Sequence, residues 1–518
     1  MSKKTEISFN LVDQPWIPVR DLQGNLIEVS LEDALLNAGK YHGIEDSSPL
    51  VVISLYRFLL AVLHRALNGP SDISVAAEWY KNGLPNNMIK SYLKKWYDRF
   101  DLFHEEYPFY QTTAAIDENF FSEWQRLSSE EGNYNTSFLY NYSKRDSYAL
   151  FSKATTPSHI ARLLLEHSSF ALDGLIKRYA FRQGNTPLID YAIMLIKGKD
   201  LFQDLIFNLV PYPNYHTDEA AWERAPYSKK YLDKKTAPSR KAKGVVDLYT
   251  WLSRSYYIKA DGCGLIYQIY YASGVDFNEG NYDVIDPMLR YCVDKKKGIK
   301  VLRLKPGKSF WRDFNSIYNS STSNSRSPIV SHHARTLIKK VKSNDVFHIR
   351  IYGLLKSKSG QKIDNQFCEE YLLPSVYRDD DELYSFFLEL IEGSLTSQEK
   401  LNMAVWNLSI NLLKMDGKAS EKDVLKIRKT LPHEEAYWSH MGEAFHHLLS
   451  MLNVDYIEKQ VVSFWKTEQI KALQKAWRTV EITVGSDGRA LRALSKSTYI
   501  ITQRINELKG VKVKEEIV

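Results

Sequence analysis

The stretch Val461-Val-Ser-Phe464-Trp465-Lys-Thr-Glu-Gln-Ile470-Lys-Ala-Leu473-Gln-Lys-Ala-Trp477 decides the fold of the C-terminal part of this 518-residue chain. Its large apolar side chains recur every three or four positions, which places them along one face of an α-helix. The same spacing, with few helix breakers, runs from about residue 381 to about residue 509. It predicts a bundle with four long helices. The expected helices lie at about 382–392, 397–415, 420–430, 433–453, 455–482 and 487–509.

The residues before about 379 have a different pattern, because short strand-like runs alternate there with turns and isolated helices. A short strand over 9–20 that enters a turn at Pro15, a loop over 21–25 and a return strand over 26–30 predict an N-terminal hairpin. Residues 354–363 look like the tip of a second hairpin. Further strand candidates lie at 265–273, 301–304 and 346–355. We therefore predict an α+β protein, with a mixed α/β domain over residues 1–378 followed by a C-terminal four-helix bundle over residues 379–518.

Capping residues mark two helix starts in the N-terminal domain. Ser30 is a predicted N-cap for a helix that runs to about Asn37. Thr156 followed by Pro157 predicts a helix that runs to about Leu172, because proline is favoured at the first helical position. The most apolar run, residues 50–63, is interrupted by Arg57 and is predicted to be a core helix, not a membrane span.

The composition is that of a soluble globular protein, with 44% hydrophobic and 25% charged residues. The three cysteines, Cys263, Cys292 and Cys368, are far apart, which excludes a disulfide framework and a self-contained four-cysteine zinc site. Few cysteines also fit a reducing compartment. The first residues lack the apolar core of a signal peptide, so a cytoplasmic location is expected.

The positive charge is concentrated in three segments, residues 224–243, 290–308 and 335–362. Each contains eight Lys or Arg residues against one Asp, so each carries +7. Because the formal net charge of the whole chain is only +7, the remainder carries −14. Concentrated Lys and Arg favour a polyanionic partner such as nucleic acid, although solvated basic loops give the same pattern.

Catalytic motifs are missing from the sequence. It contains no phosphate-binding loop, dinucleotide fingerprint or nucleophile elbow. The strongest metal-like pattern is a set of four residues on one predicted helix, namely His440, Glu443, His446 and His447. Di-iron bundles need a second Glu-x-x-His pair, which is absent, so a helix face with hydrogen-bonded imidazoles is the simpler interpretation. We predict a binding protein without metal or cofactor, and not an enzyme.

Several short segments occur in an order and spacing that match one family. They are Phe9-Asn-Leu-Val-Asp-Gln-Pro-Trp16-Ile-Pro-Val-Arg20, Tyr107-Pro-Phe-Tyr-Gln111, the Asn-rich stretch 133–142, Leu248-Tyr-Thr-Trp251-Leu-Ser-Arg254, Asp286-Pro-Met288 and Trp311-Arg-Asp313. Together they resemble the landmarks of the large subunit (CasA) of the type I-E CRISPR surveillance complex, Cascade. Tyr107 stands where the family has histidine. The resemblance covers nearly the whole chain.

The resemblance implies a non-catalytic DNA-binding subunit of a crRNA-guided antiviral complex. In this family the large subunit recognises the PAM in duplex target DNA and wedges the strands apart to start R-loop formation, while the guide RNA reads the target sequence. The implied partners are double-stranded target DNA, the crRNA-containing Cascade subunits and the helicase–nuclease that is recruited to the R-loop. The implied fold is a mixed α/β domain followed by a four-helix bundle.

The resemblance also assigns DNA-contacting positions. The lysine that approaches the PAM corresponds to Lys296, and the glutamine of the wedge hairpin corresponds to Gln361, in a tip over residues 357–362. The full implied set is Lys295, Lys296, Lys297, Lys358, Gly360, Gln361 and Lys362. A hairpin tip is thin enough to enter a duplex, where unstacking a base step costs roughly a few kcal/mol.

Two further loops are implied by the same resemblance. The Asn-rich loop seats the subunit on the complex, which points to Phe138, Leu139 and Asn141. A second loop contacts the PAM side in the family and is glycine-rich there. Here it has one glycine, and its implied residues are Gly174, Lys177 and Arg178. Because close backbone approach needs glycines, the two basic side chains are expected to make contacts in their place.

The residues themselves leave two other functions open. One is a metal-dependent nuclease that uses His440, Glu443 and His447, which metal-dependent DNA cleavage lost in Glu443→Ala would indicate. The other is a helical scaffold that binds RNA without sequence preference, which binding without PAM dependence would indicate.

Overall fold

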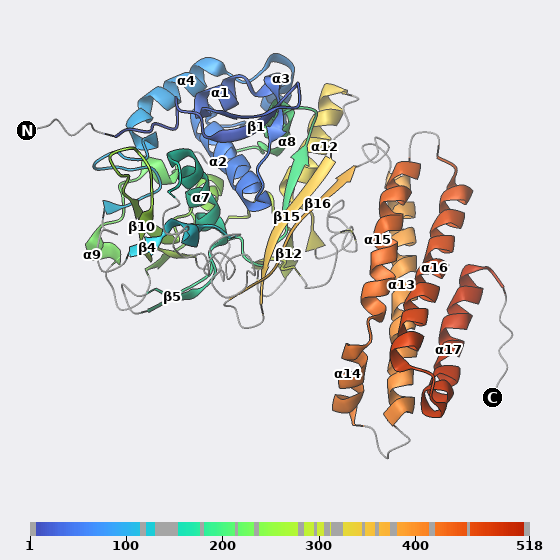
Figure 1. Cartoon of the computed structure of the whole chain (residues 1–518). Helices are drawn as coiled ribbons and strands as arrows, with labels where there is room; N and C mark the ends of the chain where they lie inside the picture. The colour runs from blue at the N-terminus through green and yellow to red at the C-terminus, as the bar shows by residue number, and fades with distance from the viewer. Residues whose placement is uncertain are drawn as a thin grey trace, which may run out of the picture. The chain divides into compact units, whose positions relative to one another are not determined.

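The computed structural model describes residues 7–113, 121–129, 154–176, 181–212, 216–232, 238–277, 284–294, 298–304, 311, 325–343, 348–357, 362–372, 381–413, 420–452 and 456–511. The chain divides into two compact units (Figure 1). The first unit comprises Met1–Pro306 and Asn315–Glu370, and the second comprises Gly307–Phe314 and Tyr371–Val518. The chain therefore passes three times from one unit to the other.

The strands of the first unit form small sheets. β1 (Ile17–Asp21) pairs antiparallel with β2 (Leu26–Val29) and β3 (Tyr41–Ile44), which confirms the predicted N-terminal hairpin, although its first strand begins at Ile17 and not at Phe9. In the order of hydrogen-bonded neighbours, the other sheets are β4 (Phe121–Glu123)–β10 (Gln268–Ser273)–β9 (Arg254–Ile258), β11 (Asp276–Phe277)–β8 (Ser239–Arg240), β13 (Gly298–Val301)–β12 (Tyr291–Asp294)–β14 (Ser325–Arg326), β16 (Ile363–Leu372)–β15 (His348–Lys356)–β7 (Ile193–Lys197) and β5 (Gly174–Ile176)–β6 (Phe181–Gln183).

Two of the three strand candidates from the sequence are confirmed, as β10 and β15. The third prediction, 301–304, is wrong in its position, because β13 ends at Val301. The two leucines of this stretch bond to residues outside the strands. Leu302 N donates to Arg290 O, just before β12, at 2.9 Å, and Leu304 N donates to Asp190 O, before β7, at 2.8 Å. The strand itself is Gly298–Val301, in which Ile299 and Val301 alternate with Gly298 and Lys300.

The first unit is built around α2 (Pro49–Leu67), the helix predicted from the apolar run. Ser48 caps its N-terminus by accepting from Val51 N, and Pro49 occupies the first turn. By length and composition α2 would suit a membrane span, but 94% of its apolar window is buried inside the protein. Arg57 on this helix is 2% exposed and forms an ion pair with Asp286 at 2.8 Å. The prediction of a core helix is confirmed.

The other helices of the first unit pack around α2 or cover the small sheets. Ser30 accepts from Asp33 N, and Thr156 accepts from His159 N, so both predicted N-caps are confirmed. The remaining α-helices are α1 (Leu31–Leu36), α3 (Ile73–Asn82), α4 (Asn86–Lys95), α7 (Pro157–Phe170), α8 (Leu201–Asn208), α9 (Lys229–Leu232), α10 (Val245–Tyr249) and α12 (Ile329–Val341). Short 3-10 turns are η1 (Ala38–Lys40), η2 (Tyr97–Phe100), η5 (Trp124–Leu127) and η7 (Ala221–Glu223).

Two of the sequence landmarks meet in one aromatic cluster. The Trp16 and Phe109 rings both pack edge-on against Phe58 of α2, with centroids 5.6 Å away. Gln111 then fixes the corner, because its amide donates to Leu102 O at 2.8 Å and accepts from Ile258 N at 2.7 Å. These landmarks hold the core of the first unit together.

The second unit consists mainly of helices. Figure 1 shows α13, α15, α16 and α17 side by side, and α13 packs on α17 while α15 packs on α16. The helices are α13 (Asp381–Leu413), α14 (Glu421–Thr430), α15 (His433–Met451), α16 (Glu458–Val484) and α17 (Gly488–Leu508). The chain is therefore a mixed helix-and-strand unit followed by C-terminal helices, as the sequence predicted. On α16, Trp465 and Leu473 are fully buried, whereas Phe464 and Ile470 are only partly buried.

One predicted break within this unit is wrong. Separate helices at about 382–392 and 397–415 were expected, but α13 continues through Gly393. The Gly393 carbonyl accepts from the Ser397 hydroxyl at 3.0 Å and from Arg504 Nη2 at 3.1 Å. A Cβ at this position would lie 3.6 Å from the Gln469 side chain. The close packing and the side-chain hydrogen bonds explain why a glycine inside a helix does not end it.

Trp311 belongs to the helical unit although it lies in the middle of the N-terminal sequence. Its ring stacks on Phe445 with centroids 4.7 Å apart and meets Trp438 edge-on at 5.4 Å. It is 2% exposed. The sequence predicts a single boundary at 379, whereas in the structure the second unit begins at Tyr371 and includes the segment Gly307–Phe314, which carries Trp311.

Candidate nucleic-acid interface

The β15–β16 hairpin is the structural counterpart of the predicted wedge. The two strands are hydrogen-bonded neighbours, and Ser357 N donates to Lys362 O at 2.7 Å where the tip begins. The prediction of a hairpin here is confirmed. Lys362 is exposed at its base. The implied DNA-contacting residues Lys358, Gly360 and Gln361 lie outside the described residues.

A single carboxylate joins the two strands of this hairpin. Glu370 of β16 accepts from Arg350 Nε at 2.8 Å and lies 3.1 Å from His348 Nδ1, both on β15. Hydrogen bonds from His348 and Arg350, together with their charges, outweigh burial and lower the pKa of Glu370 to about 2. Arg350 is therefore paired within the fold, and the formal charge of segment 335–362 overstates what it offers to a polyanion.

The second basic segment forms another hairpin. β12 and β13 pair antiparallel with Asp294 opposite Gly298. Lys295, Lys296 and Lys297 follow Asp294 in the sequence and lie outside the described residues. Beyond β13 the chain continues to Arg303, whose guanidinium lies 3.6 Å from the Asp190 carboxylate.

The third basic segment, residues 224–243, has a different role where it is described. Arg224 and Arg240 both bind Asp247, with closest distances of 2.7 and 2.5 Å. Burial raises the pKa of Asp247, but the hydrogen bonds from Arg240 and the charges of both arginines outweigh it, so the pKa is lowered. Arg240 also stacks over Trp251 at 4.0 Å. These two arginines stabilise the fold, whereas Lys229 and Lys230 of α9 are exposed.

The predicted PAM-side loop corresponds to the β5–β6 hairpin, which starts at Gly174. Lys177 and Arg178 lie outside the described residues. The base of this hairpin is held by Arg254, which is 2% exposed and donates to both Leu172 O and Gly184 O at 2.8 Å.

In the sequence, Arg254 stands out only as the last residue of the Leu248–Arg254 landmark. The Trp251-x-x-Arg254 spacing was the available signal for this residue. Because guanidinium donors are directional, Arg254 positions both ends of the hairpin at once.

The implied seating loop cannot be placed in the fold. Phe138, Leu139 and Asn141 all lie outside the described residues, so their assignment stays a prediction.

The histidine cluster on α15 is divided among separate contacts. His440 Nε2 lies 2.8 Å from Glu468, His446 stacks on Tyr371, and His447 packs on Phe464. Within the described ranges, no group of three or more His, Cys, Asp or Glu residues is placed to hold a metal ion. The interpretation of these histidines as partnered side chains on a helix face is confirmed for His440, and the nuclease alternative gains no assembled site from them.

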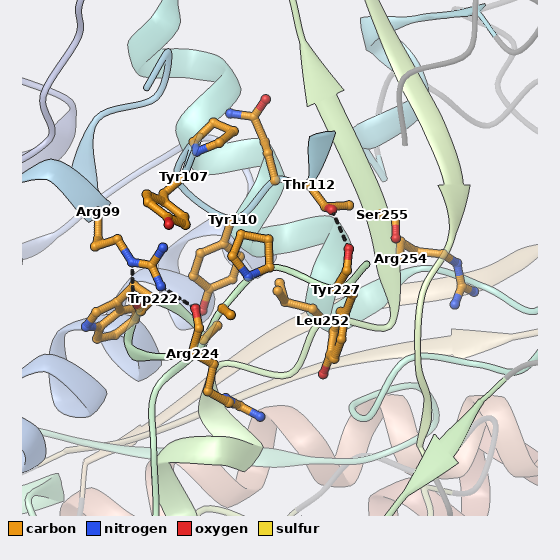
Figure 2. Close-up of a pocket in the computed structure, with 15 residues that line it drawn as sticks. Arg99, Tyr107, Tyr110, Thr112, Trp222, Arg224, Tyr227, Leu252, Arg254 and Ser255 are labelled. Atoms are coloured by element: carbon orange, nitrogen blue, oxygen red, sulfur yellow. Dashed lines mark hydrogen bonds between the residues drawn. The ribbon is translucent and has the colours of Figure 1, made fainter. Parts of the chain in front are cut away.

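The first unit also contains a pocket with about 690 Å³ of empty space, open solvent included (Figure 2). Arg99 lies at its wall, donates to Trp222 O at 2.8 Å and covers the Tyr107 ring at 4.3 Å. Figure 2 shows Arg254 turned away from the pocket. The described residues that line it include no carboxylate, imidazole or thiol. The pocket therefore lacks the groups that usually perform acid–base or metal chemistry.

Comparison with known proteins places these features in one family. The family model for CRISPR-associated protein Cse1 matches residues 10–480. The chain is 30% identical over 517 residues to the CRISPR-associated protein CasA/Cse1 of Thermus thermophilus, covering 96% of this chain and 98% of that protein.

Solved structures agree with this match. The structure of Thermus thermophilus CasA (Cse1) aligns with a TM-score of 0.80 at 28% identity, over 96% of this chain and 99% of that one. A chain from a structure titled CRISPR RNA-guided surveillance complex aligns with a TM-score of 0.71 at 15% identity, over 96% of this chain and 99% of that one.

Proposed function

This chain belongs to the CRISPR-associated Cse1 (CasA) family, and from that premise we propose that it is the non-catalytic DNA-binding subunit of a crRNA-guided surveillance complex. It recognises the PAM in duplex target DNA, opens the first base pairs and helps to recruit the helicase–nuclease. Its partners are the crRNA-containing subunits and double-stranded DNA, and it acts in the cytoplasm.

The observation that carries this proposal is the β15–β16 hairpin. Its strands are held together by Glu370, and its tip is flanked by Lys356 and the exposed Lys362. A narrow element with a basic flank suits insertion into a duplex, because the exposed Lys362 can bind phosphate while the tip unstacks a base step. In this proposal Gln361 is the inserted residue, and Lys296 contacts the PAM.

Two loops complete the proposed interface. The β5–β6 hairpin, held by Arg254, approaches the PAM side with Lys177 and Arg178. Phe138, Leu139 and Asn141 seat the subunit on the rest of the complex. This division of labour leaves target sequence to the guide RNA and leaves the PAM and the opening of the duplex to the protein.

The test uses the assembled complex with Lys296→Ala or Gln361→Ala. We expect each variant to assemble normally and to lose PAM-dependent binding of a duplex target, measured by gel shift at several salt concentrations. Gln23→Ala, at the exposed turn between β1 and β2, is a matched control and should bind like the wild type. Wild-type target binding by both variants would refute the site assignment. Binding that ignores the PAM would favour the non-specific RNA scaffold instead.

A further inference from the structure

Asp190 bonds to the segment that follows β13 and to the last residues of β15, and we infer that it is a positioning residue that holds the β12–β13 hairpin in place relative to the β15–β16 hairpin. The inference deepens the proposed function and rests on it. Asp190 lies just before β7, in a segment that the sequence analysis left without a role.

The backbone of Asp190 connects the two hairpins directly. Its N–H donates to Leu354 O at 2.9 Å, which is near the end of β15 and close to the wedge tip. Its carbonyl accepts from Leu304 N at 2.8 Å, three residues beyond the end of β13. The N–H of Asp190 is therefore bound to β15, and its carbonyl is bound to the segment that follows β13.

The side chain of Asp190 repeats this bridge. Oδ1 accepts from Lys356 N at 3.0 Å, at the last residue of β15. Oδ2 lies 3.8 Å from Lys356 Nζ and 3.6 Å from Arg303 Nη1. Asp190 is 8% exposed, so these ion pairs are partly shielded from solvent screening.

The backbone conformation of Asp190 indicates that these bonds are strong enough to hold it. Its φ is +66°, in the left-handed region that non-glycine residues seldom adopt, although Asp and Asn tolerate it best. Strained residues persist only where the surrounding structure determines them. The bonds to Leu304, Leu354 and Lys356 supply that constraint.

A packing contact at Gly353 also holds the segment after β13 close to β15. A Cβ on Gly353 of β15 would lie 3.0 Å from the Leu304 side chain and 2.3 Å from the Phe367 ring. Glycine at this position therefore lets the segment after β13 approach the β15–β16 hairpin closely. Asp190 and this contact together tie the segment after β13 to the β15–β16 hairpin.

This arrangement matters at the step in which the duplex opens. The wedge can unstack the first base pair only if it lies at the correct distance from the turn that holds the PAM. Loosening Asp190 should therefore weaken binding to a closed duplex, while a target that is already open beside the PAM needs no wedging. A residue that only stabilised the fold would affect both targets equally.

The experiment compares Asp190→Ala with the wild type in the assembled complex. Two targets are used, one fully paired and one with mismatched base pairs next to the PAM. We expect about tenfold weaker binding of Asp190→Ala to the paired target and an unchanged affinity for the mismatched target, measured by fluorescence anisotropy. Asp261→Ala, whose carboxylate caps the turn before Leu265, is the control and should bind both targets normally.

Asp190→Asn provides the second variant, because asparagine tolerates the left-handed conformation and keeps an acceptor for Lys356 N. It loses the charge, so we expect about a threefold loss on the paired target and none on the mismatched one. Equal losses on both targets, or no loss on either, would overturn the inference. If Asp190→Ala does not assemble, the Asn variant decides by the same criterion.

Failure of this inference is distinguishable from failure of the proposed function. If Lys296→Ala and Gln361→Ala abolish binding but the Asp190 variants show no preference for the mismatched target, only the positioning role is lost. If Lys296→Ala and Gln361→Ala themselves bind like the wild type, the proposed interface is wrong, and the positioning role falls with it.

Discussion

Residues 224–243 and 335–362 carry the same formal charge of +7, yet the structure uses them differently. In the first segment, Arg224 and Arg240 converge on the buried Asp247 and stabilise the fold. In the second, Arg350 is paired across the hairpin, while Lys362 remains exposed where the tip begins. Formal charge therefore does not measure the charge that is available to a polyanion, because each carboxylate that pairs with an arginine within the fold removes part of it.

Removing Asp247 should have the largest effect. Asp247→Ala leaves two arginines without their partner at a carboxylate site that is 1% exposed, and breaking such a buried pair costs about 3–5 kcal/mol. We expect a large drop in the melting temperature of the purified chain, measured by differential scanning fluorimetry. Lys243→Ala breaks the exposed pair with Glu219 and should change stability by less than about 1 kcal/mol. Similar melting temperatures for both variants would contradict the structural role of Asp247.

The hairpin side of the comparison should respond to Gly353→Ala. The new methyl group would meet Phe367 and Leu304, and overpacking of this kind costs about 1–3 kcal/mol. We expect faster amide hydrogen exchange in β15 and β16 than in the wild type. Gly39→Ala, where nothing lies within 4 Å of the added atom, should leave exchange unchanged. Unaltered exchange in Gly353→Ala would show that the two hairpins are not tightly packed.

The exposed lysines separate the two segments in solution. In the assembled complex, Lys358→Ala combined with Lys362→Ala should reduce the slope of log K against log salt by about 1.8, which is about 0.9 for each lost phosphate contact. The pair Lys229→Ala and Lys230→Ala on α9 is the matched control and should leave the slope unchanged. A larger slope change in the α9 variant would show that the DNA contacts lie in segment 224–243 and not in segment 335–362.

The smallest effect concerns the acid stability of the hairpin. The pKa of Glu370 is lowered from 4.5 to about 2, so its contribution is complete above pH 4.5 and is lost as the pH falls toward 2. The carboxylate is 39% exposed, and solvent screening keeps the contribution modest. We expect Glu370→Gln to reduce the pH dependence of hydrogen exchange in β16 over this range. The wild type and the variant losing protection in parallel would argue against the role of Glu370.

Local patterns in the sequence predicted the elements whose signals are themselves local. Ser30 and Thr156 cap helices as expected, since a cap depends only on the next few residues. The apolar period on α16 predicted that Val461, Trp465, Leu473 and Trp477 are buried. The β15–β16 hairpin was also predictable, because a polar Ser-Gly turn separates two runs with strand character.

Elements that depend on distant partners were predicted less well. A break between helices was expected between residues 392 and 397, but α13 continues through Gly393, which contacts Gln469 and Arg504 of other helices. Trp311 was assigned to the first domain by its position in the chain, whereas its ring stacks on Phe445 of the second unit. Gln469 and Arg504 are far from Gly393 in the sequence, and Phe445 is far from Trp311, so no local pattern contains these partners.

The sequence by itself determined the fold class, the helical C-terminal part, the family resemblance and the concentration of positive charge in three segments. Tertiary structure alone decided which of those charges are paired, and which residues join one hairpin to another. Asp247 and Asp190 are ordinary acidic residues in the sequence. Their roles arise because folding brings distant donors to one carboxylate, where burial strengthens each hydrogen bond and ion pair beyond its worth in water.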